Sequence, residues 1–224
     1  MYKKLDINYY LELQRRYESI LLNVSLHKNN FETFSIKIEN LFVDTCAFFD
    51  SLCQTHILDY KNGGNNFISE SSVPDLNKKL DGKTFFNIND YRNLFESKYK
   101  TSTLNINLNC YIDNYVGNPI FYINQTNRTV DFFTIKPFEN WQSSKNPDWW
   151  KDYTSMKHNR LNNIRLGNLG NLTKALGATF IILTIKNIET FKNALIDKEI
   201  YNIFFPCYWE VKGISTSRGN ISFK

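Results

Sequence analysis

A repeating pattern between Glu32 and about His56 is the feature of this sequence that most constrains its fold. Its positions recur at i, i+1, i+4, i+7 and i+8, the spacing of a wide buried stripe on one face of an α-helix. They are Leu41, Phe42, Thr45, Phe48, Phe49, Leu52, Cys53 and His56. A stripe this broad needs other helices to cover it, so the pattern predicts a mainly α helical bundle.

Three further segments have helical character. Asn8 to about Leu26 has the periodicity of an amphipathic helix, and Asn89 to about Tyr99 predicts a shorter helix capped by Asn89 or Asp90. Leu172 to about Ala194 is apolar nearly all round in its middle, which predicts a central helix. Within it, Gly177 and Ala178 would let a neighbouring helix approach closely.

Two stretches interrupt the helical pattern. Residues 59–83 are rich in Gly, Asn and Ser and predict a long surface loop. Residues 104–135 predict a small β insertion, with an alternating strand over 104–112, a hairpin partner at 120–123 and a third strand at 129–135. We therefore expect a single domain over residues 1–224, with N-terminal helices at 1–58, this loop, the β-hairpin insertion as an α+β elaboration, and two helices within 147–194. The last residues, 212–224, read as a loose basic tail.

Composition narrows the setting without naming a function. Hydrophobic residues make up 42% and aromatic residues 16%, which is enough for a sizeable core. The net charge of +5 permits an anionic partner such as nucleic acid but does not require one. The first residues lack a secretory signal, and the longest apolar run, Ala175 to Ile185, is too short to cross a bilayer. We expect a cytoplasmic protein with no membrane contact.

The cysteines and histidines argue against a metal or another cofactor. No C-x-x-C pair occurs, and the three histidines form no close cluster with the cysteines. We expect reduced, mostly buried thiols at Cys46, Cys53, Cys110 and Cys207. His56 ends the apolar stripe, where a lone histidine is usually a core residue.

The segment from Pro147 to Arg165 carries the most distinctive chemistry, and its pattern predicts one continuous helix. On a helical wheel, a broad apolar arc forms from Trp149, Trp150, Tyr153, Met156, Leu161 and Ile164. Lys157 and Arg160 fall inside this arc. His158 lies on the adjoining polar flank with Lys151 and Arg165, each seven residues away, so these three are expected to share one side of the helix.

Two motifs carry a resemblance to a known family. They are Pro147-x-Trp149-Trp150-x-x-Tyr153-x-x-x-Lys157-His158-x-Arg160 and Asn171-Leu172-x-x-Ala175-Leu176-x-Ala178-x-Phe180. They resemble a group of bacterial proteins that is similar to the HEPN superfamily. The resemblance implies a helical bundle, often dimeric, of the kind found in toxin–antitoxin, abortive-infection and CRISPR-linked defence systems. Active members are metal-independent ribonucleases in which an arginine precedes a histidine by four to six intervening residues on one helix.

This chain departs from that spacing. No arginine precedes His158 at the required distance; Lys151 does, with six residues between, while Arg160 and Arg165 follow. Lysine keeps the charge but loses bidentate phosphate geometry.

The first hypothesis is an RNA-acting, homodimeric protein. In it His158 is the acid/base of a metal-independent endoribonuclease, Arg160 is a catalytic organiser, and Lys151, Lys157 and Arg165 bind RNA phosphate. For Trp149, Trp150 and Tyr153, the sequence leaves base stacking and core packing open, with core packing the commoner role at the start of an amphipathic helix.

The second hypothesis is a non-catalytic HEPN-like module of a bacterial or phage defence system that binds a protein partner. In it Lys157 and Arg160 tie helices together through a carboxylate of the 32–56 helix, with Glu39, Asp44 and Asp50 as candidates, because buried charges must be paired. A solvent-open His158 facing a cleft with Lys151 and Arg165 would favour the first hypothesis. A buried His158 with an acid-paired Arg160 would favour the second.

Overall fold

The fold comes from a computed structural model, which describes residues 2–61, 80–108, 123–124, 129–130, 133–143, 145–186, 204–207, 210–211, 214–217 and 220–222. Its α-helices are α1 (Tyr2–Leu21), α2 (Ile36–Lys61), α4 (Ile88–Tyr99), α5 (Asp148–His158), α6 (Arg160–Asn163) and α7 (Leu169–Lys186). Short 3-10 turns are η1 (Lys28–Asn30), η3 (Thr101–Thr103), η4 (Trp141–Ser143) and η5 (Ile164–Leu166). The prediction of a mainly helical bundle is confirmed.

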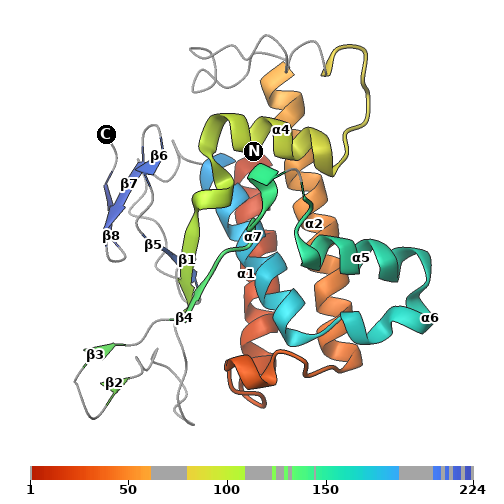
Figure 1. The fold of residues 1–224 in the computed structure, drawn as a ribbon, viewed down its shortest axis with the longest axis vertical. Helices are drawn as coiled ribbons and strands as arrows, with labels where there is room; N and C mark the ends of the chain where they lie inside the picture. The colour runs from red at the N-terminus through yellow and green to blue at the C-terminus, as the bar shows by residue number, and fades with distance from the viewer. Residues whose placement is uncertain are drawn as a thin grey trace.

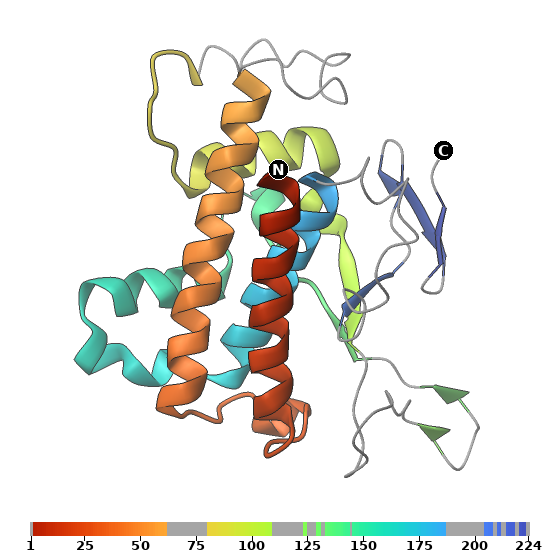
Figure 2. The same ribbon diagram turned by 180° about the vertical axis from the view of Figure 1, so that it is seen from behind.

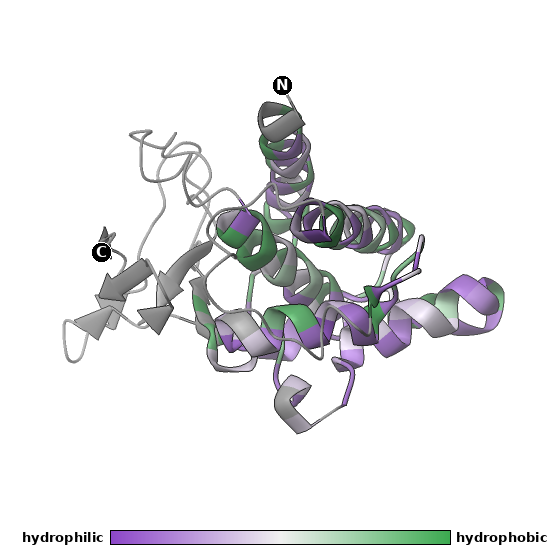
Figure 3. Ribbon diagram, turned by 90° about the horizontal axis from the view of Figure 1, so that it is seen from above, coloured by the Kyte–Doolittle hydropathy of each residue, from purple (hydrophilic) through white to green (hydrophobic). Residues whose placement is uncertain are grey.

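The bundle is centred on α7. It packs against α2 and α1, and the three helices run side by side (Figures 1 and 2). From Leu169 to Ile185, every residue of α7 except Lys174 is buried, so its nearly continuous apolar sequence reflects a helix covered on all sides. Hydrophilic residues lie on the outer faces of the helices (Figure 3). Among the described helices, none is long and apolar enough to span a bilayer.

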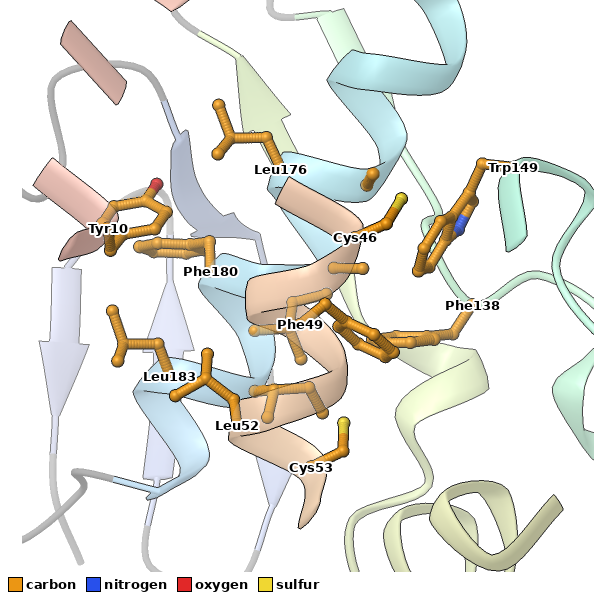
Figure 4. Packing of buried hydrophobic residues seen from close by; sticks show 14 of the residues in the cluster. Tyr10, Cys46, Phe49, Leu52, Cys53, Phe138, Trp149, Leu176, Phe180 and Leu183 are labelled. Carbon is orange, nitrogen blue, oxygen red and sulfur yellow. The ribbon is translucent and has the colours of Figure 1, made fainter. Parts of the chain in front are cut away.

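The predicted stripe of α2 forms the other half of the core. Phe49 is fully buried and meets the ring of Trp149 edge-on, with ring centroids 5.2 Å apart (Figure 4). The ring of Phe138 lies on the same phenylalanine at 6.1 Å. Cys46, Leu52 and Cys53 complete this face of α2. One helix therefore joins α7 to the chain around α5.

The predicted shorter helix, α4, is held to α2 by polar contacts. Its cap is Asn87, whose side chain accepts from the backbone N–H of Asn89 at 2.9 Å, so the predicted cap at Asn89 or Asp90 is wrong by two or three residues. The Tyr91 hydroxyl donates to Asp50 Oδ1 at 2.6 Å. Burial, followed by the hydrogen bond to Asp50, raises the pKa of Tyr91, so the phenol stays protonated and keeps donating.

Three antiparallel strands lie against the bundle. β1 (Asn105–Leu108) pairs with β4 (Phe133–Ile135) on one side and with β5 (Phe204–Cys207) on the other. Gly177 of α7 packs under this sheet, because a Cβ there would lie 3.1 Å from Ile135 Cδ1 and closer still to Ile106. The predicted close approach at Gly177 is thus made by strands and not by a helix.

Smaller strand pairs complete the described chain. β2 (Ile123–Asn124) pairs with β3 (Thr129–Val130), and β6 (Glu210–Val211), β7 (Ile214–Ser217) and β8 (Asn220–Ser222) form an antiparallel meander. The expected loose tail at 212–224 is therefore wrong. Residues 109–122 lie outside the described residues, so the 104–112 strand is seen only in part and its hairpin with 120–123 stays a prediction.

Two of the predicted helices begin or end at other residues than expected. α1 begins at Tyr2, earlier than predicted, and α2 begins at Ile36 and runs to Lys61. Phe34, just before α2, forms a β-bridge with Asn168 that interrupts the helical pattern. Most of the predicted 59–83 loop, at residues 62–79, lies outside the described residues, as do residues 187–203, which include the predicted end of the central helix at about Ala194.

The burial of Cys46 and Cys53 leads to a testable prediction. Burial, with a smaller contribution from the charge of Asp50, raises the pKa of both thiols well above the ordinary value. A raised pKa leaves less reactive thiolate at any given pH. We expect iodoacetamide at mildly alkaline pH to modify both cysteines only as fast as the folded protein opens, and rapidly in urea, as measured by peptide mass spectrometry. Rapid labelling of either thiol in the folded protein would contradict this packing.

Candidate functional site

The predicted helix from Pro147 to Arg165 is interrupted at Asn159. α5 ends at His158, Asn159 has non-helical backbone angles (φ −150°, ψ 72°), and α6 and η5 follow with a new direction. We call residues 157–167 the elbow. In Figures 1 and 2 it lies on the side of α2 away from the β-strands. A helical wheel holds only along one continuous helix, so the sequence-based placement fails beyond His158.

The break changes the predicted apolar arc. Trp149 and Met156 are buried as expected, but Leu161 is 86% exposed on α6. Lys157 and Arg160, which the wheel placed inside the arc, are also exposed. Lys151 and His158 remain on α5, whereas Arg165 lies on η5, so the three residues do not share one helix face.

The aromatic residues at the start of α5 are part of the core. Trp149 is 1% exposed and donates its indole N–H to the carbonyl of Pro137 at 2.8 Å. Trp150 and Tyr153 are partly buried, with their ring centroids 5.3 Å apart. Burial is the largest cause of the raised pKa of Tyr153. Core packing is therefore confirmed for Trp149, which has no face open to a base.

Arg160 forms the predicted ion pair with α2. Its Nη2 donates to Glu39 Oε2 at 2.6 Å and to Asn40 Oδ1 at 2.7 Å. The Glu39 side chain is fully buried while that of Arg160 is 53% exposed. The hydrogen bond to Glu39, and then its charge, raise the pKa of Arg160, so the guanidinium stays charged. Of the three predicted carboxylates, Glu39 is the partner, and Lys157 pairs with none of the described acids.

The chain between η5 and α7 packs closely against α2 at Glu39, the residue that pairs with Arg160. A Cβ on Gly167 would lie 2.6 Å from Glu39 Cγ and 2.9 Å from its Cα, so only glycine fits here without movement of the α2 backbone. The backbone N–H of Leu169 donates to the Thr33 carbonyl at 2.9 Å. The C-terminal end of the elbow is thereby fixed against the bundle.

Asn171 organises the site in a way that the sequence did not reveal. Its side-chain amide donates to Asp152 Oδ2 at 2.7 Å and to the Leu166 carbonyl at 2.9 Å, which joins α5, η5 and α7. The sequence offered Asn168 or Asn171 as the cap of this helix, and the structure has Asn168, whose Oδ1 accepts from the Asn171 backbone N–H at 2.9 Å. The one available signal was the place of Asn171 at the head of the second motif.

The basic side chains of the elbow are exposed and mostly unpaired. Among the described residues, Lys157, His158 and Arg165 have no carboxylate partner, whereas Lys151 pairs with Asp148 at 3.0 Å. The sequence between Asp152 and Glu189 contains no acidic residue. The elbow is therefore a locally cationic surface with an exposed imidazole, which can contact an anion or exchange a proton with a bound molecule.

Other expected features can be placed as well. His56 is buried on α2 beside the ring of Phe95, with centroids 5.0 Å apart, as expected of a core histidine. Over the described part of the chain, no group of His, Cys, Asp or Glu could hold a metal ion. The structure meets one condition of each hypothesis. His158 is exposed, as expected of an RNA-acting protein, and Arg160 is paired with an acid, as expected of a protein-interaction module.

The roles of the two tryptophans can be separated by stability. Trp149→Phe leaves the buried Pro137 carbonyl without its donor, which we expect to cost about 1–3 kcal/mol in the free energy of unfolding. Trp150→Phe, at a half-buried position, should cost clearly less. Urea titrations followed by far-UV circular dichroism measure both variants. Equal losses, or an unchanged Trp149→Phe, would contradict the anchoring role of Trp149.

Comparisons of the chain with family models, with curated proteins and with solved structures found no match. The assignment of a function therefore rests on the residues of the elbow and on the resemblance of the two motifs.

Proposed function

We propose that this chain is a HEPN-like helical module that binds RNA through the elbow. The observation that carries the proposal is the group of Lys157, His158 and Arg165, which are exposed close together in sequence without carboxylate partners among the described residues. Cations left unpaired at a surface are available to neutralise phosphates, and the release of counterions from RNA then favours binding. Lys151 contributes less, because Asp148 already neutralises it.

His158 is the candidate acid/base for RNA cleavage. A neutral imidazole can take the proton of a ribose 2′-hydroxyl while its oxygen attacks the adjacent phosphorus and the bond to the 5′-oxygen breaks. The leaving 5′-oxygen then needs a proton from a second group. A homodimer would supply that group through His158 of a second copy, in keeping with the dimers of the superfamily that the motifs resemble.

A second candidate function is that of a non-catalytic protein-interaction module. The observation that favours it is Leu161, which stands 86% exposed among the cations of the elbow. A leucine adds little to phosphate binding but can fill an apolar pocket on a protein partner. Under either function, a role in bacterial or phage defence in the cytoplasm is a proposal that rests on the motif resemblance.

RNA binding should depend on the cations of the elbow. We expect Lys157→Gln/Arg165→Gln to weaken binding of a single-stranded RNA in fluorescence anisotropy. Each lost phosphate contact should also reduce the slope of log K against log salt by roughly 0.7, so the double variant should lose about 1.4.

A matched control removes the same charge elsewhere. Lys136 and Lys145 are exposed and lie before α5, so Lys136→Gln/Lys145→Gln should leave the salt slope close to that of the wild type. The elbow would not be the RNA surface if both double variants bound equally, and the RNA proposal fails if the folded wild type binds no RNA at low salt.

Cleavage is tested separately from binding. We expect the wild type to cleave RNA in the presence of a metal chelator, and His158→Ala to lose this activity while it still binds RNA through Lys157 and Arg165. His27→Ala, at an exposed histidine after α1, is the control. RNA binding without cleavage by the wild type would show a binding module and remove the catalytic role of His158.

A further inference from the structure

The side-chain polar contacts between the elbow and α2 all run through Arg160 among the described residues. Within residues 159–166, all of which the structure describes, Arg160 is the one side chain that forms an ion pair. It reaches Glu39 Oε2 and Asn40 Oδ1 through the same nitrogen, Nη2. The elbow therefore owes its side-chain polar attachment to α2 to Glu39 and Asn40, which the sequence motifs do not include.

We propose that Glu39 is a positioning residue that holds the elbow in its RNA-binding shape, and that Arg160 serves this contact and does not bind phosphate. The proposal rests on the proposed function and assigns the phosphate contacts to Lys157 and Arg165. It removes Arg160 from the catalytic group.

The burial of Glu39 is the first reason. Its side chain is fully buried, and Oε1 accepts no hydrogen bond from the described residues. If a phosphate drew Arg160 away, the carboxylate would remain buried without a counter-charge, which is strongly unfavourable. Arg160 therefore stays on Glu39 when RNA binds, whereas Lys157 and Arg165 have no such competing partner among the described residues.

The packing of Gly167 is the second reason. The side of Gly167 on which a Cβ would project lies directly against the Cα, Cβ and Cγ atoms of Glu39. Glu39 therefore also sets where the chain leaves the elbow. Arg165 is two residues before this contact and His158 two residues before Arg160. Glu39 thus locates residues on both sides of α6.

The Glu39→Gln substitution tests the proposal, because the loss of its charge and the loss of its positioning role would change RNA binding in opposite directions. Glu39→Gln removes a negative charge close to the cations, so electrostatics alone would strengthen RNA binding. If Glu39 positions the elbow, the same variant weakens binding, because a neutral amide holds the guanidinium less firmly.

The experiment measures RNA affinity and hydrogen/deuterium exchange for Glu39→Gln, Arg160→Gln and the double variant. We expect each single variant to bind RNA about fivefold more weakly, and the double variant to be no weaker than Arg160→Gln alone, because Arg160→Gln already removes the contact with Glu39. Amide exchange should rise in peptides covering 159–167 and stay unchanged in α7. Glu12→Gln, at a carboxylate of α1 that is 58% exposed, gives the same charge change and should not weaken binding.

The opposite results would overturn the proposal. Stronger RNA binding by Glu39→Gln, together with weaker binding by Arg160→Gln, would show that Arg160 is a phosphate contact that Glu39 restrains. Unchanged exchange over 159–167 in both variants would show that the pair does not hold the elbow. If the wild type binds no RNA, the proposed function fails, and the exchange measurement still decides whether Glu39 positions the elbow. Arg160→Gln, at an exposed side chain, decides the same point if Glu39→Gln fails to fold.

Discussion

The packing of α2 against α7 is the constraint on which the rest of the structure depends. α7 is buried on nearly every side, and α2 covers it along one face. The same α2 then supplies Phe49 to the aromatic contact with α5 and Glu39 to the ion pair with the elbow. Because both contacts come from one rigid helix, the cationic residues of the elbow are placed relative to the core and not by the surface chain alone.

The aromatic contact of α2 with Trp149 serves mainly stability, whereas its ion pair with Arg160 serves mainly the placement of the elbow. Trp149 is buried and fully hydrogen-bonded, so it contributes mainly to the free energy of folding. The Arg160 side chain lies half in solvent, so its ion pair contributes little to the free energy of folding and acts mainly to position the elbow. Three basic residues around it, Lys157, His158 and Arg165, are exposed and have no carboxylate partner among the described residues.

The sequence predicted the main helices. α2 and the first part of α5 followed from apolar spacing, since burial along a continuous helix repeats with the helix itself. α7 followed from its nearly continuous apolar sequence, which is typical of a helix that is covered on all sides. The break at Asn159 did not, because no proline or glycine marks it. The weak helix formers Asn159, Asn162 and Asn163 were the available signal, and tertiary contacts decide whether such a run bends.

Long-range contacts were the other limit. The sequence required an acid for Arg160 but could not choose among three, because the choice depended on where the elbow turned. In the structure Asp44 pairs with Arg16 at 2.8 Å and Asp50 accepts from Tyr91, which leaves Glu39. The pairing of β5 with β1 was likewise invisible, since Pro206 lies within the strand and its partner is far away in sequence.

The central claim is that RNA meets this protein at the elbow, and the three histidines of the chain allow a direct measurement. In imidazole NMR spectra, assigned by single substitutions, His158 is the histidine of the elbow, His56 is buried and His27 lies after α1. On titration with single-stranded RNA, the His158 signal should shift progressively while those of His56 and His27 stay in place. RNA binding that leaves His158 unshifted, or that shifts His27 in its place, would contradict the account.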